Sequence, residues 1–103
     1  MSEILSKSEN EILQIIQTST LNDDEISALI ATGKKDILIC LARHQTLNDT
    51  QIQAMIPNAV YLCLKALTKQ SLNADNKEKI IQKMMTNQVL YKEILQDLKE
   101  LKW

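Results

Sequence analysis

The chain has 103 residues, of which 45% are hydrophobic and 24% charged, and its formal net charge is −1. This length fits one domain, the hydrophobic content argues against disorder, and the balanced charge gives no sign of a polyanionic or polycationic partner. Polar residues interrupt every apolar stretch well before the roughly 18 residues needed to cross a bilayer, and the start lacks the pattern of a secretory signal. We therefore expect a bacterial, cytoplasmic protein with no membrane partner.

Helix-forming residues dominate the chain, which has one Gly, one Pro and no strict alternation of apolar and polar residues. The first helix is expected after Ser8, because Ser8 and Glu11 have the spacing of a capping box. Ile12, Ile15 and Ile16 then share one face, and Ile4 and Leu5 are assigned to an earlier turn of the same helix.

A Leu-Asn motif then occurs three times, at 21–23, 47–49 and 72–74, in steps of 26 and 25 residues. In the first copy Asn22 can cap a helix, Glu25 stands at the third helical position, and Leu21 can pack on Ile26 as a hydrophobic staple. The second copy places Leu47, Asn48, Gln51 and Ile52 in the same four roles. The motif therefore predicts helix entry at each copy.

Between the first two motifs, Gly33 is expected to end a helix in a left-handed conformation, and a further helix is predicted over 35–43. The helix that begins at the second motif should stop near residue 56, because Pro57 cannot continue it. Asn58 is expected to cap the next helix, which runs to residue 68.

The third motif is imperfect, because Lys77 stands at the staple position and Asp75 with Glu78 offers a replacement capping box. Its helix should run to Met85. The last helix is expected from about residue 88, and its apolar stripe comprises Leu90, Tyr91, Ile94, Leu95, Leu98 and Leu101.

These elements predict an all-α chain of about seven short helices in a right-handed, HEAT-like stack of helical repeats, with an irregular helical bundle as the alternative. An N-terminal cap helix over 1–20 precedes two-helix units over 21–46, 47–71 and 72–103. The expected equivalent core positions are Leu29, Met55 and Ile80, and then Ile30, Ile56 and Ile81.

Residues 41–56, which begin Leu-Ala-Arg-His-Gln-Thr-Leu-Asn-Asp, resemble one unit of the leucine-rich repeat variant family, a branch of the HEAT-like repeats. Units of that family look like Leu-Ala-x-His/Asn-Pro-x-Leu followed by two helices, and the resemblance extends weakly over 20–100. Gln45 stands where the family usually places Pro, and the third copy at 67–72 lacks both Ala-Arg and His. The resemblance implies an interaction scaffold, and no functional residue carries over.

The sequence offers little for catalysis or cofactor binding. Cys40 and Cys63 lie in apolar runs typical of core cysteines, and with the single His44 they are too few for a metal site. The acidic cluster at 23–25 fits the positive end of a helix dipole, and a general base at His44 would need an orienting partner. We therefore expect no enzyme activity, no cofactor and no metal.

We predict a non-enzymatic protein-interaction module that acts as an adaptor, accessory or inhibitor protein. The alternative is a nucleic-acid-binding repeat protein with a Lys/Arg face, although the pI of about 5.8 and the content of one Trp and two Tyr argue against it. Self-association through the ends of the stack is also possible. The residues of the expected partner surface are Lys34, Lys35, Arg43, His44, Lys65, Lys69 and Trp103, the last either packed on the core or exposed as an anchor.

Overall fold

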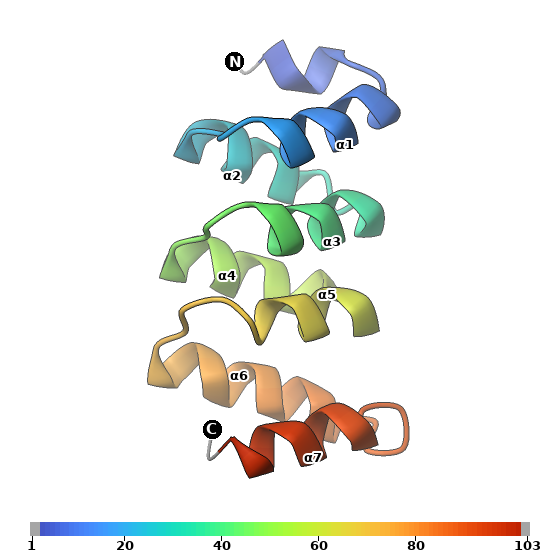
Figure 1. The fold of residues 1–103 in the computed structure, drawn as a ribbon, viewed down its shortest axis with the longest axis vertical. Helices are drawn as coiled ribbons and strands as arrows, with labels where there is room; N and C mark the ends of the chain where they lie inside the picture. Colours follow the sequence, from blue (N-terminus) through green and yellow to red (C-terminus); the bar gives the residue numbers. More distant parts are fainter. Residues whose placement is uncertain (1–2, 102–103) are drawn as a thin grey trace.

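The computed structural model describes residues 3–101, and within this range the regular structure is entirely helical (Figure 1). This confirms the all-α prediction. The elements are the 3₁₀ helix η1 (Glu3–Ser6), α1 (Glu9–Thr18), α2 (Asp23–Ala31), α3 (Lys35–His44), α4 (Asp49–Met55), the 3₁₀ helix η2 (Ile56–Asn58), α5 (Tyr61–Leu67), α6 (Ala74–Met85) and α7 (Lys92–Glu100).

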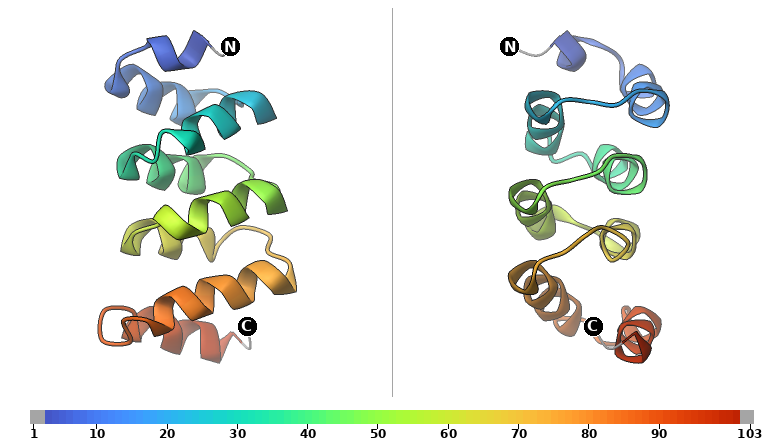
Figure 2. Two further views of the ribbon diagram at one scale, coloured as in Figure 1. Left: turned by 180° about the vertical axis from the view of Figure 1, so that it is seen from behind. Right: turned by 60° about the vertical axis from the view of Figure 1, so that its left-hand side comes forward.

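The helices alternate between two layers along the long axis of a molecule that measures 40 × 23 × 21 Å. Helices α2, α4 and α6 form one layer, and α1, α3, α5 and α7 form the other, as the right-hand view of Figure 2 shows. Helix α3 packs on both α1 and α5, and α2 packs on α4. Because α4 also packs on α6, α3 and α4 each have one neighbour on either side within their own layer.

The core lies between the two layers and consists mainly of branched aliphatic side chains. Its largest fully buried aliphatic members are Ile16, Leu29, Ile37, Leu38, Leu41, Ile52, Met55, Leu64, Leu67, Ile80 and Met84. The predicted core positions 29, 30, 55, 56 and 80 are buried, whereas Ile81 is only partly buried. The buried stripe of α6 is formed by residues 76, 80 and 84, and Ile81 lies at its margin.

The first two helix entries form as predicted. The Asn22 side chain accepts a hydrogen bond from the Glu25 N–H (2.8 Å), and the Glu25 carboxylate accepts one from the Asn22 N–H (3.2 Å). Asn48 and Gln51 make the same reciprocal pair, at 2.8 and 2.9 Å. The capping box therefore sets the start of both α2 and α4.

The third entry differs from its prediction. Asn73 caps α6 by accepting from the Asn76 N–H (2.7 Å), so the replacement box between Asp75 and Glu78 does not form. The amide of Asn76 instead donates to the Asp49 carbonyl (3.0 Å), and its buried Oδ1 has no hydrogen-bond partner. The motif thus keeps its cap in all three copies and loses the reciprocal bond in the third.

Gly33 has φ +67°, which confirms the left-handed end of α2. The prediction for Asn58 is wrong: Pro57 and Asn58 belong to η2, and α5 begins at Tyr61 with no side-chain cap. Proline fits the first turn of a helix, so here Pro57 continues the chain as a 3₁₀ turn and delays the next α-helix.

Two further boundaries differ from the sequence prediction. Residues 4 and 5 form part of η1, which is separate from α1. At the other end, residues 86–91 form turns and α7 begins only at Lys92, with no side-chain cap at Tyr91. Leu90 and Leu101 are therefore exposed, although the apolar stripe of the sequence includes both.

Two glutamines that the sequence analysis did not single out hold neighbouring helices together. Gln45 is buried after the end of α3, and its Nε2 donates to the carbonyls of Ile16 and Ser19 at the end of α1, both at 2.7 Å. Its Oε1 accepts from the Leu21 N–H (3.1 Å). One side-chain amide therefore hydrogen-bonds two main-chain carbonyls at the end of α1 and one main-chain N–H before α2.

Gln70 repeats this arrangement 25 residues later. Its Nε2 donates to the carbonyls of Ala42 (2.9 Å) and Gln45 (2.8 Å), and its Oε1 accepts from the Leu47 N–H (3.2 Å). We call Gln45 and Gln70 the glutamine brackets. They place the carboxyl ends of α1, α3 and α5 along one edge of the molecule.

Candidate functional site: the outer face of α1, α3 and α5

The six described residues of the predicted partner surface are all exposed, namely Lys34, Lys35, Arg43, His44, Lys65 and Lys69. Trp103 lies outside the described residues. Lys34 and Lys35 stand at the start of α3 and Arg43 at its end, about 13 Å apart along a helix with a rise of 1.5 Å per residue. The structure therefore separates the predicted surface into two parts.

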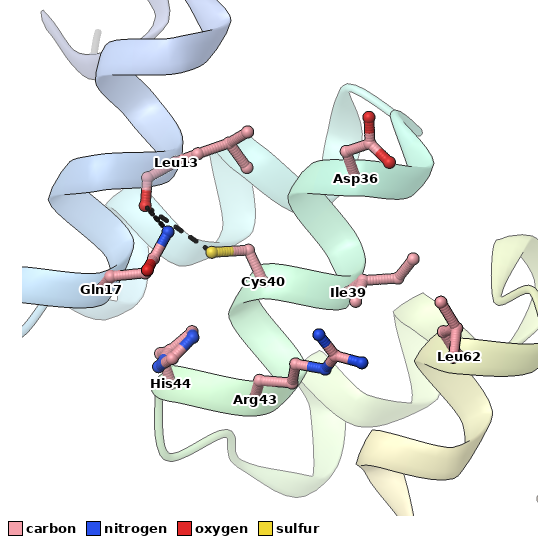
Figure 3. Close-up of a pocket in the computed structure, with 8 residues that line it drawn as sticks. All are labelled: Leu13, Gln17, Asp36, Ile39, Cys40, Arg43, His44 and Leu62. Atoms are coloured by element: carbon pink, nitrogen blue, oxygen red, sulfur yellow. Dashed lines mark hydrogen bonds between the residues drawn. The ribbon is translucent and has the colours of Figure 1, made fainter.

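The second part borders a shallow hollow of about 340 Å³ on the outer face of α1, α3 and α5. Figure 3 shows the side chains that line it. They are Leu13 and Gln17 from α1, Asp36, Ile39, Cys40, Arg43 and His44 from α3, and Leu62 from α5.

Helical spacing explains why these positions meet. Residues 36, 39, 40 and 43 recur at intervals of three and four and so share one side of α3. Residues 62, 65 and 66 have the same spacing on α5, and residues 13 and 17 have it on α1. The outer face is thus one stripe on each of three neighbouring helices.

The sequence analysis missed the apolar part of this hollow, which comprises Leu13, Ile39 and Leu62. Leu13 and Ile39 are partly buried, and Leu62 is 45% exposed. A signal was present in the sequence, because Leu13 and Ile39 are 26 residues apart, which is the first step of the Leu-Asn motif.

Cys40 lies in the floor of the hollow, and its Sγ approaches the Leu13 carbonyl oxygen at 3.6 Å (Figure 3). Burial raises the pKa of the Cys40 thiol, and a hydrogen bond with Gln17 and the charge of Arg43 oppose that rise in part. A raised pKa keeps the thiol protonated and therefore a poor nucleophile.

The cations beside the hollow have no internal counter-charge. In residues 3–101 the one salt bridge joins Lys79 to Asp75 at 3.2 Å on α6. Arg43, Lys65 and Lys69 therefore present charges that no carboxylate of the described chain neutralises at short range.

The His44 side chain is exposed and makes no hydrogen bond with a described residue, so no described group orients it as a general base. Within the same residues, no cluster of three or more His, Cys, Asp or Glu side chains could hold a metal ion. None of the helices between residues 3 and 101 combines the length and apolarity needed to cross a membrane.

Comparisons of the chain with protein-family models, with curated proteins and with solved structures find no match.

Proposed function

We propose that this chain is a non-enzymatic protein-interaction module, built from tandem two-helix units of the HEAT-like type, that binds a protein partner on the outer face of α1, α3 and α5. The observation that carries the proposal is the hollow there, where apolar Leu13, Ile39 and Leu62 lie beside Arg43, which forms no salt bridge with a described carboxylate. Apolar contacts surrounded by polar groups are typical of protein interfaces.

The construction of the chain supports the tandem arrangement. The capping boxes at Asn22 and Asn48 are 26 residues apart, and the glutamine brackets Gln45 and Gln70 are 25 residues apart. The capping boxes set equivalent helix starts, and the brackets join a helix to its neighbour along the long axis, which is the way that repeat proteins gain stability. Such stacks present extended surfaces for partners.

The proposal is tested by co-purification of the tagged chain from its native host, with Leu62→Asp as the variant. Leu5→Asp is the matched control, because Leu5 is 43% exposed and Leu62 45% exposed, and Leu5 lies in η1. We expect one stoichiometric partner that is lost with Leu62→Asp and kept with Leu5→Asp. Recovery of the bare chain, or equal loss with both variants, would count against the proposal.

The unpaired cations on α3 and α5 favour nucleic-acid binding as a second candidate. Phosphate contacts make such binding strongly dependent on salt, so the chain should then be retained on heparin at low salt and released as salt rises. Absence of retention at low salt eliminates this candidate.

A further inference from the structure

The charge and apolarity of the outer face identify the kind of partner that it fits. We propose that the hollow binds an acidic amphipathic helical segment of a partner protein, which lies across α1, α3 and α5. The inference rests on the proposed function and makes it specific. The apolar residues of the bound segment contact Leu13, Ile39 and Leu62, and the carboxylates of the segment face the cations at the ends of α3 and α5.

Two further cations lie outside the lining of the hollow. Lys65 occupies on α5 the position that Ile39 occupies on α3, 26 residues earlier, and Lys69 lies in the turn that follows the end of α5 at Leu67. The bracket from Gln70 to the end of α3 places the carboxyl ends of α3 and α5 side by side. Arg43 in the last turn of α3 and Lys65 in the last turn of α5, which Lys69 follows, therefore lie toward the same edge of the molecule.

The helix dipole explains in part why these cations lie where they do, since positive charge is favourable at the carboxyl end of a helix. It does not account for the apolar side chains beside them. Leu62 is 45% exposed, although a polar residue at this surface position would cost the core nothing. Charged side chains alone are enough for a surface that contacts only water, whereas a protein interface combines apolar and charged side chains.

The charge that lines the hollow changes along α3, because the single acidic lining residue, Asp36, lies in the first turn of this helix (Figure 3). Asp36 and Arg43 are two helical turns apart, so negative and positive charge stand at opposite ends of the hollow. Among the lining residues, Arg43 attracts an acidic segment and Asp36 repels it, whereas Lys34 and Lys35 beside Asp36 lie outside the lining.

The size of the face sets the length of the segment. Three neighbouring helices at an interaxial distance of about 9 Å span about 20 Å, which corresponds to roughly 14 residues of α-helix. A partner helix of this length presents apolar residues at intervals of three and four along one side, which matches the helix-in-groove mode of recognition.

The test uses the full chain and four labelled probes in fluorescence anisotropy titrations. The probes are an acidic Glu/Leu amphipathic peptide of about 16 residues, a Lys/Leu peptide with the same periodicity, a Glu/Ser peptide without apolar residues, and a single-stranded oligonucleotide of similar charge. We expect binding of the Glu/Leu peptide, and weaker or no binding of the other three.

The variant Arg43→Glu/Lys69→Glu should weaken binding of the Glu/Leu peptide about tenfold, since two exposed attractions become repulsions. Lys34→Glu/Lys35→Glu is the matched control, with the same change of charge at the other end of α3, and should bind as the wild type does. Circular dichroism of both variants verifies that the fold is kept.

The outcomes separate this inference from the proposed function. If no probe binds, or if both double variants weaken binding equally, the inference is overturned and the co-purified partner still decides the proposed function. Preference for the Lys/Leu peptide overturns the inference and leaves protein binding intact. Binding of the Glu/Ser peptide as tight as that of the Glu/Leu peptide overturns the apolar contribution, and preference for the oligonucleotide overturns both proposals.

Discussion

The helices from α1 to α5 and the last helix, α7, are joined by different kinds of contact. In the first region the carboxyl ends of α1 and α3 are held by the glutamine brackets Gln45 and Gln70. In the described part of α7 no side chain makes the corresponding bonds to the end of α5. Helix α7 is held by the buried Ile94 and Leu98 and by the ring of Tyr91, which stacks on Tyr61 at 5.7 Å between centroids.

The difference separates two ways of joining helices. Hydrogen bonds to main-chain groups fix the position of one helix end against the next, because they require a specific geometry. Apolar packing supplies stability with less directional restraint. We therefore expect the first region to be the more rigid, and the last helix to open before the rest of the molecule.

The largest effect is expected from breaking a bracket. Gln45→Ala leaves three main-chain groups at the joint between α1 and α3 without their partner, two carbonyls and one N–H. We expect a loss of about 3 kcal/mol in the free energy of unfolding, measured by urea denaturation. Gln96→Ala on α7, where the glutamine is exposed and unbonded, should change it by less than about 0.5 kcal/mol. Similar losses of stability from Gln45→Ala and Gln96→Ala would contradict the special role of the bracket.

The junction between the two regions should weaken at alkaline pH. Cys63 on α5 is fully buried, and burial raises its pKa from 9.0 to about 11. Between these values the unfolded thiol loses its proton and the folded thiol keeps it, so stability falls as pH rises, by about 2 kcal/mol. Lys83 has the opposite effect on stability. Burial lowers its pKa, so the unfolded state holds this proton more tightly and the contribution of Lys83 to stability rises with pH.

The measurement is the free energy of unfolding as a function of pH for the wild type and for Cys63→Ala. The variant should be less stable near neutral pH, because it leaves a small cavity, and its stability should decline less between pH 9 and about 11. Equal slopes for the two proteins would show that Cys63 does not control the alkaline loss.

A smaller effect is expected at the aromatic contact of α7. Tyr61→Leu removes the stacked pair with Tyr91 and should cost about 1 kcal/mol. Amide hydrogen exchange should accelerate in α7 and stay unchanged in α3. Tyr61→Phe keeps the ring and serves as the control, and acceleration across the whole chain would contradict a separately opening helix.

The smallest effect is a gain at the third helix entry. Asn76→Gln lengthens the side chain to that of Gln51, which reaches both the Asn48 N–H and Asp23. The variant should complete the capping box of α6 and raise the free energy of unfolding by about 0.5 kcal/mol. A loss of stability instead would mean that the buried space around residue 76 is too small for one more methylene.

Much of the fold could be predicted from local signals in the sequence. The entries at Asn22 and Asn48 and the end at Gly33 depend on neighbours within four residues, so the sequence carries them directly. The prediction at Asn58 failed because Pro57 favoured a 3₁₀ turn, and the start of α7 was missed because an apolar stripe continues through residues that form turns.

The candidate site was less accessible to prediction, because it combines residues from three helices. Its exposed cations could be named from the sequence, but their separation into two groups depends on how α3 and α5 align. Gln45 was noted only as a departure from a family pattern that has Pro there. Its partners Ile16 and Ser19 are 26 to 29 residues away, and only the assembled helices bring them within reach.

The glutamine brackets bind the main chain of the preceding helix and none of its side chains. A joint of this kind is indifferent to which residues the preceding helix carries, provided that the helix ends at the same place. Substitutions on the outer side of α1 or α3 should therefore leave these joints intact, so the surface of the molecule can change without a change in how its helices are held together. Among the described residues, α7 has no bracket of this kind and depends on the side chains of its apolar contacts.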